Sequence, residues 1–123
     1  MTIQPLSPLL ALRSIDLRDV GDRQRVESYV RGHKQGTPFH LPAWSMAVAQ
    51  GCSQISHTLI AERGDGTIVG VLPLTEVRSR LFGKALVSNG FAVGGGILAD
   101  GPAAVASLAD AGWALAQRLG MTA

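Results

Sequence analysis

Three histidines and one cysteine are the side chains of this sequence with the most versatile chemistry: His33, His40, His57 and Cys52. Histidine can act as a general base or a metal ligand, and a thiolate can attack a carbonyl carbon. No carboxylate or second cysteine stands at ligand spacing from these histidines, so the sequence does not indicate a metal site. The loop around His40 is rich in Pro and Phe, which favours a surface or capping role. Cys52 follows a short predicted helix and is expected to be a packing residue.

Three carboxylates, Glu62, Glu76 and Asp100, could each serve as a general base. Nothing in their spacing pairs any of them with a partner. No G-x-S-x-G motif is present, so a hydrolase nucleophile elbow is not indicated. The sequence therefore supplies candidate bases without assigning one.

A glycine run occupies "NGFAVGGGILAD", residues 89–100. A phosphate loop needs backbone N–H groups that converge on an anion, usually where a helix begins. Neither a Walker motif nor G-x-G-x-x-G fits, and residues 97–100 continue as a strand. The run therefore predicts a bent strand or a β-bulge, and an anion-binding role is the weaker alternative.

A small basic cluster, Arg78, Arg80 and Lys84, lies in "VRSRLFGKALVS". A solvated strand end and turn is the favoured interpretation, and the rim of a substrate groove is the functional one.

The elements that must position these groups begin with a strand over residues 14–20. Asp22 is expected to cap a helix over 22–34. A second helix is predicted over 41–51, with Pro42 in its first turn. A β-hairpin follows.

The hairpin joins a strand at 57–62 to a long strand at 67–79 through a turn centred on Asp65-Gly66. Pro73 lacks a ladder donor, so it is expected to mark a bulge or an edge. Residues 84–100 are predicted to form a strand pair or one bent strand.

A last helix is predicted over residues 101–120. One of its faces is expected to carry four apolar residues: Val105, Leu108, Leu115 and Leu119.

The resulting order, β-α-α-β-β-β-α, predicts an α+β fold with a mixed or antiparallel sheet covered by helices. The chain has 123 residues, of which 46% are hydrophobic and 16% charged, which suits one modest core. A net charge of +2 is too small to indicate a nucleic-acid or membrane surface, so no DNA partner is expected. No apolar run approaches the ~20 residues of a membrane span, and no signal peptide is recognisable. A cytoplasmic protein is expected.

Three stretches together resemble the N-terminal portion of FemAB-like proteins, in particular the branch associated with exosortase/PEP-CTERM systems. The shared pattern is a Phe–His–x–Pro–x–Trp stretch, a "VGVLPL" strand, "SRLFG" and a glycine-rich strand. The stretches are "TPFHLPAWSMAV" (37–48), "LIAERGDGTIVGVLPLTEVRSRLFGKALVS" (59–88) and "FAVGGGILAD" (91–100).

The resemblance implies a fold of the GCN5-related N-acetyltransferase (GNAT) kind. Fem proteins transfer amino acids from aminoacyl-tRNA onto peptidoglycan precursors. The exosortase-associated branch is described as an acyl or peptidyl transferase linked to extracellular polysaccharide and protein-sorting loci. The family's donor site uses a later strand and a pyrophosphate loop, and neither is matched here. No catalytic residue and no cofactor is therefore carried over, although the parent would use acyl-CoA or aminoacyl-tRNA.

By position alone, the resemblance places five residues at the border of an acceptor groove: Phe39, His40, Trp44, Arg78 and Arg80. For Trp44 a role as a core anchor between helix and sheet is favoured.

A helix closed by Gly120 should lead into another strand, so residues 1–123 are expected to be the N-terminal part of a GNAT-like domain, inactive alone. The expected partner is then the C-terminal portion of the parent. A complete small domain is the alternative. A function of another class is also open: a non-catalytic module that pairs, even with a second copy, through an open sheet edge.

Overall fold

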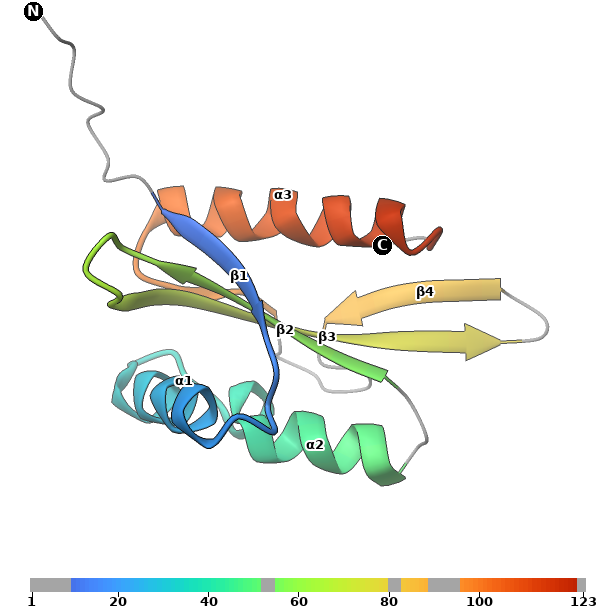
Figure 1. The fold of residues 1–123 in the computed structure, drawn as a ribbon, viewed down its shortest axis with the longest axis horizontal. Coiled ribbons are helices and arrows are strands. Elements are labelled where there is room, and N and C mark those ends of the chain that lie inside the picture. The colour runs from blue at the N-terminus through green and yellow to red at the C-terminus, as the bar shows by residue number, and fades with distance from the viewer. Residues whose placement is uncertain (1–9, 52–54, 80–82, 89–95, 122–123) are drawn as a thin grey trace, which may run out of the picture.

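The computed structural model describes residues 10–51, 55–79, 83–88 and 96–121. The chain forms an α+β sandwich in which one antiparallel sheet separates two layers of helices (Figure 1). Its elements are β1 (Ala11–Ile15), α1 (Val20–Gly32), the 3-10 helix η1 (Pro38–His40), α2 (Pro42–Gly51), β2 (Ile55–Glu62), β3 (Ile68–Ser79), β4 (Gly83–Ser88), β5 (Leu98–Ala99) and α3 (Pro102–Arg118). The predicted α+β class is confirmed, and every strand pairing described is antiparallel.

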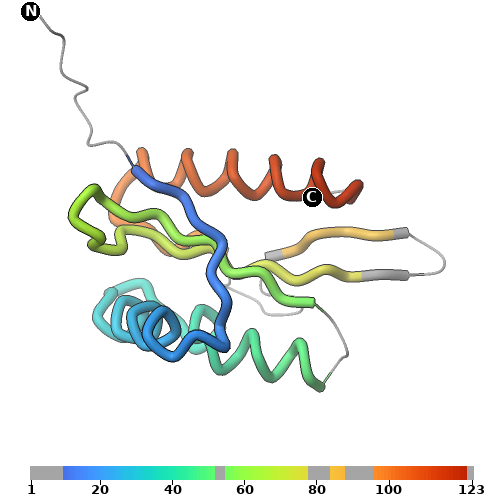
Figure 2. Tube along the Cα trace, in the orientation of Figure 1, coloured from blue at the N-terminus to red at the C-terminus, as the bar shows by residue number. Residues whose placement is uncertain are grey.

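The sheet has the spatial order β1-β2-β3-β4, and β5 pairs with β3. Strands β4 and β5 run in the same direction along the same side of β3, because β4 pairs with residues 74–79 and β5 with residues 70–71. Both described sections thus pair with β3, and residues 89–95, where the predicted bend would fall, lie outside the described residues. Figure 2 follows the same path as a tube.

Pro73 lies inside β3, the strand with partners on both sides, and its pair with Thr58 shows no register shift. The expected bulge is therefore absent on the β2 side, whereas on the other side residues 72 and 73 have no partner in the described β4 and β5. The Asp100 N–H donates to the Val69 carbonyl across 2.8 Å, so the backbone groups of alternate residues in β3 point toward β5 and β4. The Pro73 nitrogen points to that side too, at the gap between the two sections. The missing donor therefore falls where the described strands leave no ladder bond to make.

The boundaries of the first strand and helix also differ from the prediction. β1 ends at Ile15 and α1 begins at Val20, so residues 16–19 are a turn and not strand. The cap is Asp19, whose carboxylate accepts from the Asp22 N–H at 3.0 Å, and Asp22 lies in the first turn. A carboxylate in either place stabilises the N-terminal end of the helix, which is why the sequence did not distinguish them.

The two helical layers bury separate halves of the core. α1 packs Val26 and Val30 against Ile60 and Val71 on one face of the sheet. The other face is covered by α3, whose buried residues are Ala104, Leu108, Gly112, Leu115 and Ala116. Val105, predicted on the buried face, is 42% exposed, because the buried stripe runs through the smaller Ala104 and Gly112.

α3 approaches the sheet closely through two glycines. A Cβ on Gly70 would lie 2.6 Å from Leu108 Cδ1, and one on Gly112 would lie 3.3 Å from Leu72 Cδ2. Helix and strand backbones therefore pack at a distance that larger residues would prevent.

Candidate functional site

The "FHLPAW" residues form a compact unit at the start of α2. The Phe39 and Trp44 rings pack edge to face, with centroids 4.9 Å apart and planes at 76°. Both side chains are half-buried, and the ring contact described for Trp44 is with η1. Their aromatic contact fixes η1 against the first turn of α2.

His40 is buried, and both of its ring nitrogens are engaged. Nδ1 accepts from the Thr37 backbone N–H at 3.1 Å and lies 2.9 Å from Thr37 Oγ1. The other ring nitrogen hydrogen bonds to the backbone of Gly96, the last glycine of the run. Burial lowers the pKa of His40, the bond to Gly96 opposes this, and nearby His33 lowers it further. The expected capping role is confirmed, the expected surface position is wrong, and neither nitrogen is left for proton transfer.

Of the other candidate residues, only the backbone of Arg78 is described: it pairs with Lys84 near the end of the β3–β4 hairpin. Lys84 is exposed, in agreement with a solvated strand end. Arg80 and Cys52 lie outside the described residues, as do Gly94 and Gly95. Gly96 has φ of 134°, a conformation that favours glycine, and strand β5 follows at Leu98.

The structure gives each of the three candidate carboxylates a partner that the sequence did not indicate. Asp100 accepts from the Tyr29 hydroxyl at 2.8 Å and lies 3.1 Å from His33 Nε2. His33 Nδ1 accepts from the Gln35 N–H at 3.0 Å, so its Nε2 carries the hydrogen that Asp100 receives. The cluster joins the end of α1 to the start of α3.

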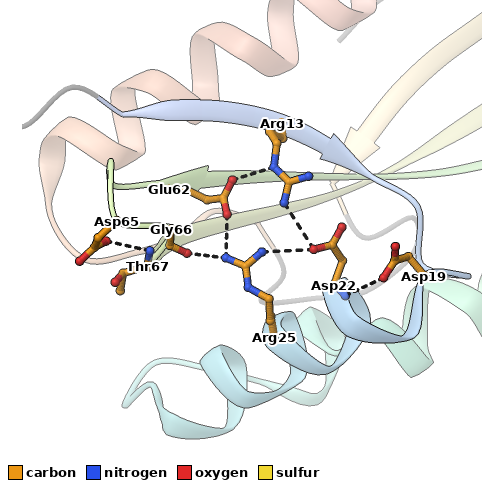
Figure 3. Close-up of polar contacts among 8 residues, drawn as sticks. All are labelled: Arg13, Asp19, Asp22, Arg25, Glu62, Asp65, Gly66 and Thr67. Carbon is orange, nitrogen blue, oxygen red and sulfur yellow. Dashed lines mark hydrogen bonds and ion pairs between the residues drawn. The ribbon is translucent and has the colours of Figure 1, made fainter.

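Glu62 is held between two arginines (Figure 3). Its Oε1 accepts from Arg13 Nε at 2.7 Å and its Oε2 from Arg25 Nη2 at 2.6 Å. Asp22 bridges the same two guanidinium groups at 3.4 and 3.2 Å, and Arg25 also donates to the Gly66 carbonyl. The hydrogen bond from Arg13 lowers the pKa of Glu62, burial opposes this, and the bond from Arg25 lowers it further. This network joins β1, α1 and the β2–β3 turn, and it is structural.

The remaining pair has the geometry of a catalytic dyad. His57 Nε2 lies 2.5 Å from Glu76 Oε2. The Glu76 side chain is 4% exposed and that of His57 is 20% exposed. A carboxylate that accepts from Nε2 fixes the orientation of the ring and directs Nδ1 away from itself. No hydrogen bond of Nδ1 to another described residue is present, so His57 is the histidine best placed to accept a proton.

His57 also lines a depression of about 430 Å³, here called the β2-edge pocket, where β1 leaves the sheet. Its walls come from the turn after β1, from α2 and from β2. The lining residues are Ser14, Ile15, Asp16, Leu17, Arg18, Met46, Ala49, Ser56, His57 and Thr58. Ser56 and His57 are consecutive in a strand, so their side chains point to opposite faces of the sheet. They cannot form a nucleophile–base pair, which excludes a hydrolase-like arrangement of these two residues.

The sequence missed the dyad because its members are diagonal neighbours across a hairpin, an arrangement set by the β2–β3 register. The detectable signal was the hairpin itself. Counting outward from Asp65-Gly66 places a histidine and a glutamate on the same face of adjacent strands.

Among the residues that the structure describes, no group of three or more His, Cys, Asp or Glu side chains could hold a metal ion. Within the same ranges, no helix is both long and apolar enough to cross a membrane.

Comparison with known proteins gave no match: no protein-family model fits the chain, and neither a curated protein nor a solved structure resembles it significantly.

Proposed function

We propose that this chain is the N-terminal part of an acyl or aminoacyl transferase of the GNAT kind, related to FemAB-like proteins and acting in cell-envelope or extracellular polysaccharide synthesis. The observation that supports it best is the layering: two helices inserted between β1 and β2 cover one face of an antiparallel sheet, and α3 covers the other. A fold supports many activities, so the site must carry the chemistry.

In this proposal His57 is the base. Amine attack on an ester or thioester carbonyl requires that the ammonium group lose a proton, and a carboxylate-oriented imidazole is suited to take it. Glu76 then stabilises the imidazolium through Nε2, at 2.5 Å. The donor, acyl-CoA or aminoacyl-tRNA, is bound by the C-terminal portion of the parent protein. As the resemblance implies, Phe39, His40 and Trp44 are proposed to border the acceptor groove. The same is proposed for Arg78 and Arg80, whose side chains the structure does not describe.

The test compares the protein encoded by the complete reading frame with the 123-residue chain. We expect the complete protein to transfer a labelled acyl or aminoacyl group to a primary amine and the short chain to be inactive. His57→Gln should lower kcat by about 100-fold or more, the usual contribution of a general base. Undiminished transfer by His57→Gln would refute the role of His57. A reading frame that stops at codon 123 would refute the partial-domain proposal.

A second function is a non-catalytic module that pairs with another chain through a sheet edge. It is favoured by β1, which lies at one edge of the sheet and is mostly exposed. Light scattering separates the two: a defined homo-oligomer of the chain supports the module, and a monomer supports the enzyme.

A further inference from the structure

β2 extends beyond its partner strand. β1 pairs with β2 only from Thr58 to Glu62, whereas β2 begins three residues earlier, at Ile55. After Ile15 the chain turns away to begin α1 at Val20. No described strand therefore pairs with the short section of sheet edge around Ser56, beside the β2-edge pocket.

The direction of the backbone groups at this edge follows from the ladder on the other side. The bond from Asp100 N–H to the Val69 carbonyl turns the Gly70 N–H toward β2, and the β2–β3 register is regular from Gly70 to Glu76. Leu59 therefore points toward β3 and Thr58 toward β1. Ser56 is two residues from Thr58, so its N–H and C=O point to the β1 side as well. No described residue pairs with them there.

The Ser56 hydroxyl, at the same section of the sheet edge, also lacks a described hydrogen-bond partner. Its Oγ is buried and has no hydrogen-bond partner in the described part of the chain. Ser56 shares a sheet face with Thr58 and Ile60, the face that α1 and α2 cover, and it lines the pocket. A buried hydroxyl without a partner is uncommon in native proteins and marks a position where a ligand can supply the missing bond.

The pocket walls determine what that ligand is. Ile15, Leu17, Met46 and Ala49 are apolar. The one cation in the lining, Arg18, is already paired with Asp16 at 2.9 Å, so an anion finds no unpaired positive charge there. Ser56 thus contributes one backbone donor, one backbone acceptor and one hydroxyl beside an apolar hollow.

We propose that the β2-edge pocket binds an extended peptide, which adds a short strand beside Ser56 and inserts one apolar side chain between β2 and α2. The peptide backbone pairs with the N–H and C=O of Ser56, as in other strand-addition complexes. One of its carbonyl groups accepts from Ser56 Oγ. This inference does not depend on acyl transfer, because a chain with no transferase activity would bind the peptide in the same way.

Amide hydrogen exchange and NMR titration of the whole chain test the proposal. The probe is an acetylated and amidated tripeptide of valine, leucine and valine. In the free chain the Ser56 amide should exchange much faster than the paired Thr58 amide, since it lacks a partner. With saturating peptide, Ser56 should gain at least about tenfold protection, and chemical shifts should change at Met46 and Ala49.

Two variants and one modified peptide define the contacts. Ser56→Ala removes the hydroxyl and should weaken binding about tenfold, while Ser28→Ala, an exposed site on α1 in a separate depression, should leave it unchanged. Ala49→Phe should block the hollow. A peptide N-methylated at leucine loses a backbone donor and should bind at least tenfold more weakly.

Three results would overturn the proposal. The first is an absence of shift changes at millimolar peptide. The second is equal binding by the N-methylated peptide, which would indicate a non-strand ligand. The third is a Ser56 amide that is already as protected as Thr58 in the free chain.

Discussion

His57 and Glu76 lie on adjacent strands as diagonal neighbours, and their side chains meet at 2.5 Å on one face of the sheet. The Glu76 side chain is nearly buried, whereas the His57 side chain is partly exposed to solvent. A double-mutant cycle with His57→Gln and Glu76→Gln, followed by urea unfolding, should give a coupling energy of about 2 kcal/mol. Glu76→Gln should cost more than His57→Gln, because Glu76 makes a further interaction. Additive single and double mutants would show that the contact contributes nothing.

Glu62 is expected to stabilise the fold in a pH-dependent way. Glu62→Gln leaves Arg13 and Arg25 without their shared carboxylate and should lower the free energy of unfolding by about 2 kcal/mol at pH 7. The pKa of Glu62 is lowered in the folded state, so this stabilisation is present above the unfolded-chain pKa of 4.5 and is lost as the pH falls through the folded-state pKa. Urea unfolding from pH 7 down to pH 3 should show the wild type and the variant converging.

The control for Glu62 is Glu27→Gln. Glu27 forms an exposed pair with Arg31 at 2.9 Å along α1, and its loss should cost no more than about 0.5 kcal/mol. An equal loss in the free energy of unfolding for the two variants would show that Glu62 stabilises the fold no more than an exposed ion pair does.

His40 should make the protein sensitive to mild acid. Its pKa is lowered from 6.5, mainly by burial, so the folded state binds the proton less readily than the unfolded chain. The free energy of unfolding should therefore be highest above pH 6.5 and should decrease as the pH falls through the window between the unfolded and folded values. In His40→Asn, which keeps an acceptor for the Thr37 N–H, the profile between pH 7 and pH 5 should be flatter. Thermal unfolding in a pH series measures both profiles, and parallel curves would contradict the assignment.

Gly70 should tolerate no larger residue. In Gly70→Ala the new Cβ would press on Leu108, which has no exposed surface, so we expect a loss of about 1–3 kcal/mol despite the higher strand propensity of alanine. Gly51→Ala is the matched control, because a Cβ there meets nothing within 4 Å and helix propensity favours alanine. Chemical unfolding of both variants compares them, and a stabilised Gly70→Ala would mean that α3 shifts freely.

Prolines, glycines and turn residues in the sequence correctly predicted the helix ends and the turn, because these features depend on residues adjacent in the chain. Pro42 and Gly51 bound α2 as predicted, and the Asp65-Gly66 turn joins β2 to β3, with Gly66 at a φ of 87°. Pro73 lies opposite neither of the described sections of β4 and β5, which pair with residues 74–79 and 70–71. Those strands come later in the chain, so the residues around Pro73 could not indicate which side of it is paired.

Most contacts of the candidate site could not be predicted from the sequence, for a related reason. Asp100 meets Tyr29 from 71 positions away, and Glu62 meets Arg13 from 49. Such contacts depend on which strands pair and which helix crosses which face, and spacing along the chain does not encode them. His40 was selected for its motif, and the structure shows that it ties η1 to Gly96.

The position of β1 has a consequence for the order in which the protein forms. β2, β3 and β4 follow one another in the chain and pair as a meander, so they can assemble from local contacts. β1 is made first, but it has no partner until β2 has been synthesised, since Arg13 and Glu62 are 49 positions apart. Closing that long loop is slow relative to hairpin formation. We therefore expect β1, with its arginine, to join last, as the step that completes cooperative folding.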